Sequence, residues 1–314
     1  MLFGLKNGDY VALIAPSGIP SISKVHRGIE NIKALQLNPI AYDGEKIVQS
    51  DEAITAVLIR KYGYLAGSDQ RRLSELHWAF ADNKVKAIFA IRGGYGATRL
   101  LPFINYSLIA HNPKILIGYS DITAIQMALY HRVGLQSLHG IVAGDVFTDY
   151  HFKQLRKFLF GELKSEVLDC YEDKDFSIIV PGEAYGVLVG GNLSLLSSLV
   201  GTGFLPSFAG KIVFIEDIAE PIYKIDRMLE HLLQGTDLSF ASAFVFGEFT
   251  GIEPQKNDFE LSELLYEKFG NMGVPVIMGV NFGHITNKCI FPIGVEVFIS
   301  TNPFEVRLVS NIYK

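Results

Sequence analysis

The stretch KILIGYSDITAIQMAL, Lys114–Leu129, decides how this chain folds. An apolar run ends at Gly118, Ser120 follows two residues later, and a helical pattern begins at Asp121. A strand that turns sharply into a helix is the repeating element of a parallel sheet covered by helices. Functional groups of such sheets gather at the carboxyl ends of the strands, which is where Ser120 stands.

The same alternation of β-rich runs and amphipathic patterns surrounds this stretch throughout the first half of the chain. We expect strands within residues 10–18, 85–96 and 113–121, and helices within residues 23–36, 70–82 and 122–133. The predicted fold class is therefore α/β, with helices on both faces of a parallel sheet.

The second half is richer in strands. Residues 150–182 lack strong periodicity and predict a connection between two lobes. Strands are then expected within residues 184–191, 210–217, 241–249, 274–283, 296–300 and 305–310, with one clear helix at 222–234. We place an N-terminal domain at 1–165, a linker at 166–183 and a smaller β-rich domain at 184–314.

Composition excludes several classes of function. The 314 residues are 49% hydrophobic and 19% charged, with a formal net charge of -5, so the charge does not indicate binding to nucleic acid or anionic lipid. The uncharged segment 184–210 is broken by Gly-Gly-Asn, serines and a proline, which favours strand, loop and short helix over a membrane span. Asp9 interrupts the first apolar run, so no signal peptide is expected and the predicted location is cytoplasmic.

Cys170 and Cys289 fit no metal-site spacing and are expected to be reduced thiols.

Three loops could carry chemistry at the strand ends: Ala15–Gly18, Arg92–Gly96 and Gly118–Asp121. Ser120 is either a nucleophile lifted by a sharp turn or a helix cap. The glycines of RGGYG favour either half of an oxyanion hole or a phosphate loop, although the pattern is neither GxGxxG nor a P-loop. Arg92 is either a carboxylate ligand or a member of a structural ion pair.

A serine nucleophile needs a base and a carboxylate that orients the base. His139 and His284 each follow an apolar run beside a glycine, and the residues alone do not choose between them. Glu216 ends an apolar strand and is either the orienting carboxylate or an ordinary acid facing solvent. Asp217 is expected to point the opposite way along that strand.

An ordered set of motifs resembles the LD-carboxypeptidase family of serine peptidases, which includes murein tetrapeptide carboxypeptidases and microcin-immunity peptidases. The set runs from about Val11 to about Gly294 and consists of IAPSG, RGGYGATRLLP, IGYSDITA, LHG, GGNLSLL, FIEDIAEPIYKIDRML and FGHITNKCIFPIG. The resemblance implies a nucleophile domain similar to class I glutamine-amidotransferase-like folds, followed by a smaller β-rich domain.

The resemblance also assigns roles. It implies a triad of Ser120, Glu216 and His284, with His139 left as a wall residue. The oxyanion donors it implies are the backbone amides of Gly94 and Asp121. Residues expected to bind substrate are Arg92, Gly93 and Tyr95, and no metal or other cofactor is expected.

The implied reaction is hydrolysis of the amide between an L-centre, lysine or diaminopimelate, and a terminal D-amino acid in a murein tetrapeptide, through an acyl-enzyme. A homodimer is compatible with the family. One alternative is a microcin-type immunity peptidase, which would need an aromatic platform for a purine in the second domain, whereas the one tryptophan, Trp78, lies on a first-domain helix. A non-catalytic peptide-binding module would lack a triad member, and an amidotransferase would need cysteine at Ser120. Ile141, Ile222 and Lys224 depart from the family pattern where substrate could be lined.

Overall fold

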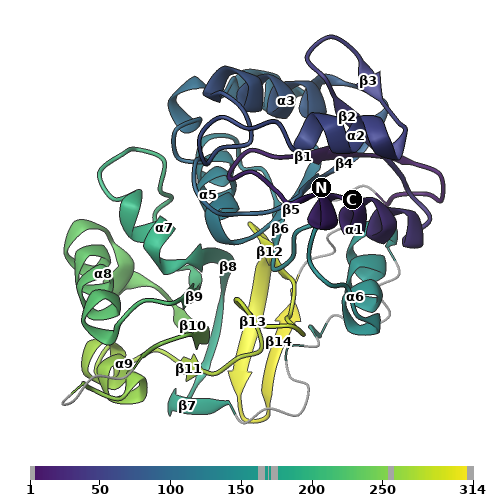
Figure 1. Cartoon of the computed structure of the whole chain (residues 1–314). Helices are drawn as coiled ribbons and strands as arrows, with labels where there is room; N and C mark the ends of the chain where they lie inside the picture. The colour runs from purple at the N-terminus through teal and green to yellow at the C-terminus, as the bar shows by residue number, and fades with distance from the viewer. Residues whose placement is uncertain (1–3, 162–166, 169, 171–175, 254–257, 310–314) are drawn as a thin grey trace. The chain divides into compact units, whose positions relative to one another are not determined.

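The computed structural model describes residues 4–161, 167–168, 170, 176–253 and 258–309. The chain divides into two compact units, Met1–Leu163 and Lys164–Asn311. Each unit contains its own sheet and its own covering helices (Figure 1).

Six strands of the first unit lie in the order β6-β5-β4-β1-β2-β3. All neighbours pair in parallel except β2 and β3, which are antiparallel. Their bounds are β1 Tyr10–Ile14, β2 Asn38–Tyr42, β3 Ile47–Val48, β4 Val85–Ala90, β5 Ile115–Gly118 and β6 Ser137–His139. The predicted parallel sheet is confirmed, and β2 and β3 are strands that were not predicted from the sequence.

The strand order places a topological switch point between β1 and β4. From β1 the chain moves to β2 on one side, and it later returns to β4 on the other side of β1. Loops leaving two such neighbouring strands diverge and open a crevice at the carboxyl end of the sheet. The loops that leave β1 and β4 are those of Ala15–Gly18 and Arg92–Gly96.

Most first-unit helices begin directly after a serine or asparagine whose side chain caps the helix N-terminus, as these residues commonly do. Ser21, Ser50 and Ser68 each accept a backbone N–H at the start of α1, α2 and α3, and Gly134 ends α5 in the left-handed conformation. The helices are α1 Ile22–Ala34, α2 Asp51–Leu58, α3 Asp69–Ala81, α4 Tyr106–His111, α5 Thr123–Val133 and α6 Asp149–Phe160, with 3₁₀ turns at Leu101–Phe103 and Ser120–Ile122.

Helix α6 lies where the sequence analysis expected an irregular connection, so that expectation is wrong for residues 150–160. In DYHFKQLRKFLF, lysines and an arginine interrupt the apolar pattern, but the buried residues form two rows spaced four residues apart. The rows are Tyr150, Gln154 and Phe158, and His151, Leu155 and Leu159. The charged run of residues 171–175 lies outside the described residues.

The second unit contains a mixed sheet in the order β14-β13-β8-β9-β10-β11-β7. Strands β8 to β11 are parallel, while β13, β14 and β7 add antiparallel edges. The bounds are β7 Ser177–Val180, β8 Glu183–Asn192, β9 Ile212–Ile218, β10 Ala243–Thr250, β11 Val276–Met278, β13 Glu296–Thr301 and β14 Phe304–Leu308. Another short strand, β12, spans Phe291–Ile293. The predicted strands are confirmed, and β7 and β12 are additions.

Helices connect the parallel strands of the second unit. They are α7 Leu193–Ser198, α8 Ile222–Gly235 and α9 Leu261–Phe269, with a 3₁₀ turn at Leu238–Phe240. Phenylalanines fill the core beside the sheet, where Phe244 packs on Phe269 with ring centroids 4.4 Å apart and Phe214 meets Phe282 at 5.7 Å. The uncharged segment 184–210 forms β8, α7 and a loop, as predicted. Within the described part of the chain, every helix is too short or too polar to cross a bilayer.

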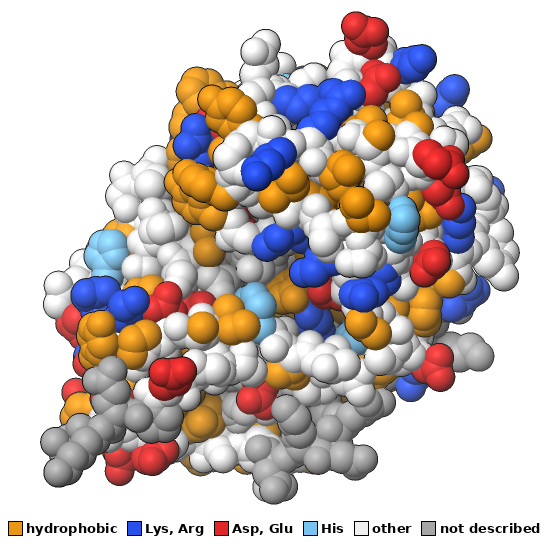
Figure 2. All heavy atoms as spheres, viewed as in Figure 1, with side chains coloured by type: hydrophobic (Ala, Val, Ile, Leu, Met, Phe, Trp, Pro, Cys, Tyr) orange, Lys and Arg blue, Asp and Glu red, His pale blue; other side chains and the backbone are white. Residues whose placement is uncertain are grey.

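Charged side chains of both signs are interspersed with apolar ones on the face shown in Figure 2. This distribution agrees with the modest net charge of -5.

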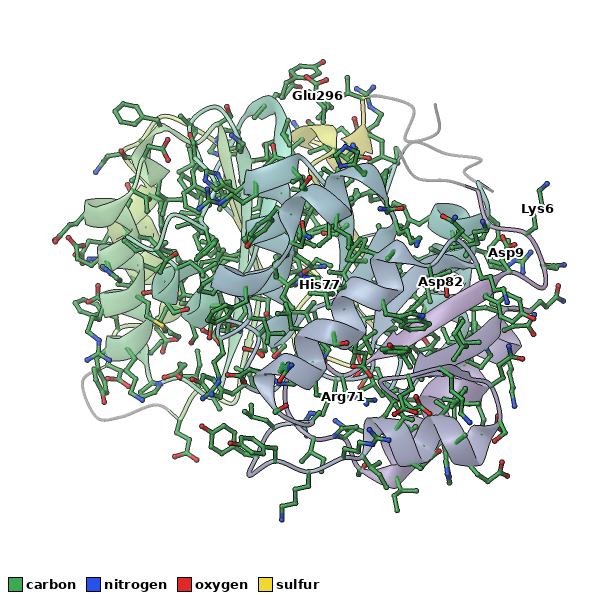
Figure 3. All side chains as sticks on the ribbon, turned by 90° about the horizontal axis from the view of Figure 1, so that it is seen from above. Lys6, Asp9, Arg71, His77, Asp82 and Glu296 are labelled. Atoms are coloured by element: carbon green, nitrogen blue, oxygen red, sulfur yellow. A yellow bond between two sulfur atoms is a disulfide. The ribbon has the colours of Figure 1, made fainter. Side chains whose placement is uncertain are left out.

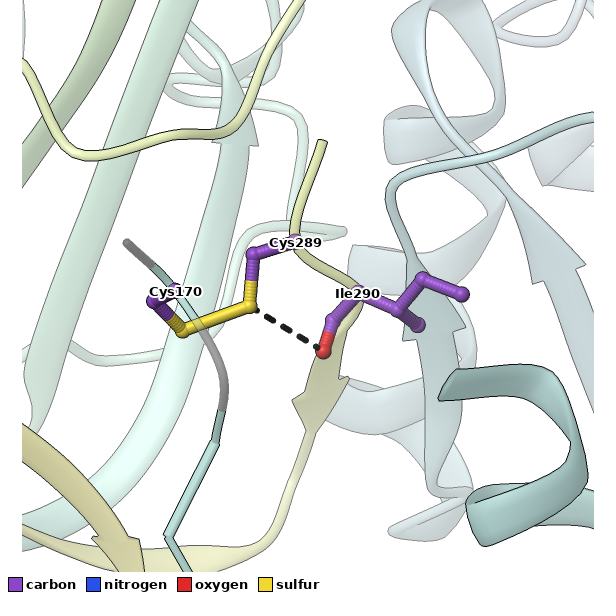
Figure 4. Close-up of a disulfide and its surroundings, with 3 residues drawn as sticks. All are labelled: Cys170, Cys289 and Ile290. Atoms are coloured by element: carbon purple, nitrogen blue, oxygen red, sulfur yellow. Dashed lines mark hydrogen bonds between the residues drawn. A yellow bond between two sulfur atoms is a disulfide. The ribbon is translucent and has the colours of Figure 1, made fainter. Parts of the chain in front are cut away.

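The expected pair of free thiols is wrong, because Cys170 and Cys289 form a disulfide (Figure 4). Their Cα atoms are 5.0 Å apart, within the range that a disulfide spans. The two cysteines are 119 residues apart in the sequence, so no local pattern indicated that they meet in the fold. The backbone of Asn281 bonds to both cysteines. Its N–H donates to the carbonyl of Cys170, and its carbonyl accepts the N–H of Cys289.

We expect reduction of this disulfide to lower the free energy of unfolding by about 3–5 kcal/mol, because it closes a long loop in the unfolded chain. Urea titrations of the oxidised protein and of a Cys170→Ser, Cys289→Ser variant would measure the difference. Neither cysteine of the oxidised protein has a free thiol, so it should bind no thiol reagent, folded or unfolded. Two thiols titrating in denaturant without a reductant would contradict the crosslink.

Candidate active site

Three loops meet at the carboxyl edge of the first-unit sheet. The N–H of Gly18 donates to the carbonyl of Gly93 at 3.4 Å, which joins the loop after β1 to the loop after β4. Gly93 in turn lies against Ser120 in the loop after β5. The structure therefore brings together the three loops that the sequence singled out in this half of the chain.

Ser120 has a left-handed backbone, with φ of 62°. A residue with a side chain rarely adopts this conformation, and such strain gathers at functional sites. Gly118 makes the turn possible, because a Cβ there would lie 2.7 Å from the Ile122 side chain. The geometry is that of a sharp strand-to-helix elbow that exposes a side chain above the sheet.

Helix capping does not account for Ser120. The 3₁₀ turn begins at Ser120, α5 follows at Thr123, and neither has a side-chain cap bond. The Ser120 side chain is instead half-buried and faces the glycine-rich loop, where Gly93 would bring a Cβ within 3.0 Å of its Oγ. Only glycine at position 93 allows the backbone to approach the hydroxyl this closely.

The side chain of Asp121 is buried directly behind the elbow. Its Oδ2 accepts the N–H of Ala97 at 2.8 Å, immediately after the glycine-rich loop. Burial raises the pKa of the Asp121 carboxyl, and the Ser17 hydroxyl and the Ala97 amide oppose that rise. The backbone N–H of Asp121, the donor expected for an oxyanion, belongs to the same short turn.

In the second unit, His284 and Glu216 form a hydrogen-bonded pair. His284 Nδ1 lies 2.7 Å from Glu216 Oε2, with the Glu216 side chain fully buried and the His284 side chain 14% exposed. A carboxylate only accepts, so the hydrogen of this bond is on His284 Nδ1, and Nε2 is the ring nitrogen outside the bond. Oε1 of Glu216 has no hydrogen-bond partner among the described residues.

The loop after β11 carries His284 across the end of β10 to reach Glu216 on β9. The N–H of Val280 donates to Phe246 and the N–H of Glu248 donates to Phe282, which fastens the loop to β10. A Cβ on Gly283 would lie 3.2 Å from Glu216 Oε2, so glycine permits the close approach. Ser120 belongs to the first unit, and Glu216 and His284 belong to the second.

His139 has a different environment from His284. It ends β6, is fully buried, and its Nδ1 lies 3.4 Å from the Gln126 side-chain oxygen. The partner of His284 is a carboxylate, whereas Nδ1 of His139 faces an amide oxygen. The geometry therefore favours His284 as a base.

Asp217, the neighbour of Glu216, supports the second unit. Its oxygens accept the side chains of Asn192 and Ser194 and the N–H of Ser194, so it holds the start of α7. Adjacent residues on a strand face opposite ways, which agrees with the different partners of Glu216 and Asp217.

Arg92 is held by backbone carbonyls. Its Nε donates to Gly93 at 3.0 Å and its Nη1 to Ile19 at 2.9 Å, and no described carboxylate forms an ion pair with it. The structural ion pair considered from the sequence is therefore absent from the described part of the chain. The neighbouring Tyr95 is half exposed, and its ring lies 5.7 Å from that of Tyr64.

The three departures from the family pattern have different environments, and Lys224 is partly exposed. Ile141 and Ile222 are buried, and Lys224 pairs with Glu220 at 3.3 Å. Trp78 lies on α3, as expected, and stacks on Tyr42. Among the described residues, no group of three or more histidine, cysteine or acidic side chains is placed to hold a metal ion.

Sequence reasoning missed two buried ionisable side chains on α3, Arg72 and Glu75. Glu75 Oε2 accepts the N–H of Ala15 at 2.8 Å, and Arg72 donates to the carbonyls of Pro16 and Gly96. Their spacing of three, beside the core residue Leu76, was the available signal, because charges on the buried face of a helix need partners.

Comparisons with known proteins agree with one another. Residues 11–140 match the LD-carboxypeptidase N-terminal domain and residues 185–299 match the C-terminal domain. A probable murein peptide carboxypeptidase of Bacillus subtilis (strain 168) is 36% identical over 303 residues, covering 95% of this chain and 90% of that protein. The structure of a muramoyltetrapeptide carboxypeptidase from Oxalobacter formigenes has a TM-score of 0.80 at 26% identity, covering 95% of this chain and 97% of that one. An MccF-like protein from Bacillus anthracis str. Ames has a TM-score of 0.82 at 27% identity, covering 98% of each chain.

Glu75 should make stability depend on pH. Burial raises the pKa of its carboxyl from 4.5 to about 7, so the folded protein holds a proton that the unfolded chain releases. The contribution of this retained proton to the free energy of unfolding is therefore fully present below about pH 4.5 and is lost as the pH rises through about 7. The loss is on the order of 3 kcal/mol.

Glu75→Gln keeps an acceptor for Ala15 without the titration. Urea unfolding of both proteins at pH 5 and pH 8 should show the variant gaining relative stability at the higher pH. Parallel pH profiles for the two proteins would contradict the raised pKa.

Proposed function

We propose a mechanism and a substrate for this chain, which belongs to the LD-carboxypeptidase family and is a serine-type carboxypeptidase hydrolase. The proposed reaction removes a terminal D-amino acid from an L-centre, lysine or diaminopimelate, in a murein tetrapeptide. The observation that carries the proposal is the left-handed elbow at Ser120 beside the glycine-rich loop. The similarity to the probable murein peptide carboxypeptidase of Bacillus subtilis and to the muramoyltetrapeptide carboxypeptidase of Oxalobacter formigenes supports the substrate class.

In the acylation step, Ser120 Oγ attacks the carbonyl carbon of the scissile amide and its proton passes to His284 Nε2. This step requires the two units to bring these atoms within hydrogen-bond reach. The oxyanion receives hydrogen bonds from the backbone amides of Gly94 and Asp121. The C–N bond then breaks, and the imidazolium returns the proton to the departing D-amino acid.

Deacylation repeats these roles with water. Water attacks the Ser120 ester, gives its proton to His284, and the L-centre leaves with a new carboxylate while Ser120 regains its hydrogen. Glu216 favours both steps because its buried charge has one hydrogen-bond partner among the described residues, His284. An imidazolium beside it provides the opposite charge that a buried carboxylate lacks.

Arg92 is the proposed recognition group for the terminal carboxylate. Its Nε and Nη1 are fixed by Gly93 and Ile19, which orients the guanidinium beside the loop. Gly93 and Tyr95 border the same position and complete the proposed substrate-binding surface. A guanidinium held by neutral carbonyls keeps its charge for a ligand.

The microcin-type reading remains the second candidate, because the MccF-like structure is as similar as the murein peptidase structure. The same residues would act on an aminoacyl-nucleotide amide. An aminoacyl sulfamoyl adenosine therefore belongs in the assay as a competing substrate.

Incubation with L-Ala-D-Glu-diaminopimelate-D-Ala should release one alanine, detected by mass spectrometry. Ser120→Ala should stay folded and lose turnover by about 10⁴-fold or more, as for a triad nucleophile. A thermal melt of the variant serves as the folding control. Near-wild-type turnover of the variant would refute the serine mechanism, and cleavage of the adenosine conjugate alone would favour the second candidate.

Amidation of the terminal carboxylate should lower kcat/KM by about 2 kcal/mol, or roughly 30-fold, because the donors lose their charged partner. Arg92→Met should remove most of this preference for the acid. Arg60→Met is the matched control, because Arg60 is exposed and donates to the carbonyl of Asp43, outside the site loops. Equal cleavage of acid and amide by the wild type would show that no carboxylate pocket exists.

A further inference from the structure

One peptide unit, between Gly96 and Ala97, is held from both edges by buried charged side chains. Arg72 Nη1 donates to the Gly96 carbonyl at 2.8 Å, and Asp121 Oδ2 accepts the Ala97 N–H at 2.8 Å. The Arg72 side chain is fully buried, and Asp121 is 1% exposed. These two contacts lie immediately after the glycine-rich loop.

The C=O and N–H of a trans peptide unit point in opposite directions. Arg72 and Asp121 therefore grip the unit at opposite edges, each beside the end of the peptide dipole that attracts it. Rotation of this unit would break both charge-assisted bonds at once, and such bonds are about twice as strong as neutral ones. Two bonds on one peptide plane fix its orientation more firmly than either bond alone.

The grip fixes one end of a loop whose other end is fixed by β4. At that end the N–H of Ile91 donates to the carbonyl of Ile14, so only residues 92–95 lie between the two anchors. Gly94, within that short span, has φ of 115°, a conformation that glycine alone adopts readily. A loop of glycines would otherwise sample many orientations of its amides.

The same two side chains join this loop to the other loops of the site. Arg72 also donates to the carbonyl of Pro16, in the loop after β1. Asp121 follows Ser120 directly, so the elbow and the glycine-rich loop are tied through one residue. A displacement of the loop would therefore have to displace the elbow as well.

We propose that Arg72 and Asp121 form a clamp on the Gly96–Ala97 peptide unit that positions the oxyanion-binding amides against Ser120. Arg72 is a positioning residue, since it acts through the backbone of the loop, and so is the Asp121 side chain. The inference rests on the proposed serine mechanism. Nothing in it depends on which peptide is cleaved.

Arg71 provides a matched control on the same helix. Figure 3 labels Arg71 and His77 on α3 and Asp82 directly after its end. Arg71 also donates to backbone carbonyls, but these belong to Tyr42 and Asp43, outside the site loops. Arg71→Met therefore removes a comparable arginine without touching the clamp.

Three measurements test the clamp in Arg72→Met, Asp121→Ala, Asp121→Asn and Arg71→Met. The first is kcat and KM with the tetrapeptide, the second is the rate at which a fluorophosphonate modifies Ser120, and the third is amide hydrogen exchange across residues 92–98. Arg72→Met and Asp121→Ala should lower kcat and the modification rate by about 100-fold, as a misplaced oxyanion donor does, with KM within about threefold. Amide exchange in residues 92–98 should be faster in both.

Asp121→Asn should recover most of the loss seen in Asp121→Ala, because the Asn side-chain oxygen can still accept the Ala97 N–H. If Arg72→Met does not fold, the Asp121 pair tests the clamp by itself. Retention of kcat within threefold in a folded Asp121→Ala protein, or loop exchange equal to that of Arg71→Met, would overturn the proposal. Failure of the wild type to cleave the tetrapeptide while fluorophosphonate still modifies Ser120 would instead refute the substrate, leaving the clamp testable.

Discussion

The left-handed backbone at Ser120 is the constraint on which the first-unit site depends. A φ of 62° at a residue with a Cβ costs on the order of 1 kcal/mol, so neighbouring contacts must hold it. Those contacts exist only because positions 93 and 118 lack side chains. Gly118 leaves room for the chain to turn, and Gly93 leaves room for the loop that faces the hydroxyl. The strain, the two glycines and the strand-to-helix turn are thus one arrangement rather than separate features.

A comparable constraint orders the second unit around Glu216. Its side chain is fully buried, and a buried carboxylate is unfavourable unless a donor or a positive charge meets it. His284 reaches it because the loop after β11 is fastened across β10 and because Gly283 has no Cβ to obstruct the approach. Each unit therefore prepares one half of the proposed chemistry within its own fold. The serine, its loop and its elbow belong to one sheet, and the base with its carboxylate to the other.

The sequence predicted those structural features that depend on residues close together along the chain. Gly118 and Ser120 between an apolar run and a helical pattern predicted the elbow, and the alternation around them predicted the parallel sheet. Local patterns failed where the information was distributed: in α6, charged residues concealed two buried rows, and Cys170 and Cys289 lie 119 residues apart. Glu75 and Arg72 were missed because the loop groups they reach, at Ala15, Pro16 and Gly96, are backbone atoms, which a sequence does not display. The choice between His139 and His284 needed the family motifs, since both follow an apolar run beside a glycine.

The charges of α3 also show what the site loops require beyond stability. Burying a guanidinium costs desolvation free energy, and replacing a whole buried ion pair with apolar side chains is often neutral or stabilising by about 1–4 kcal/mol. An apolar side chain cannot, however, donate to the carbonyls of Pro16 and Gly96, and it cannot tell one rotation of a peptide unit from another. Hydrophobic burial holds a segment in place but has no direction, whereas a guanidinium with several acceptors fixes orientation. The loops here are rich in glycine and proline, with few side chains of their own to pack. Their geometry must therefore be set through the backbone, and buried charges from α3 and Asp121 are the groups that reach it.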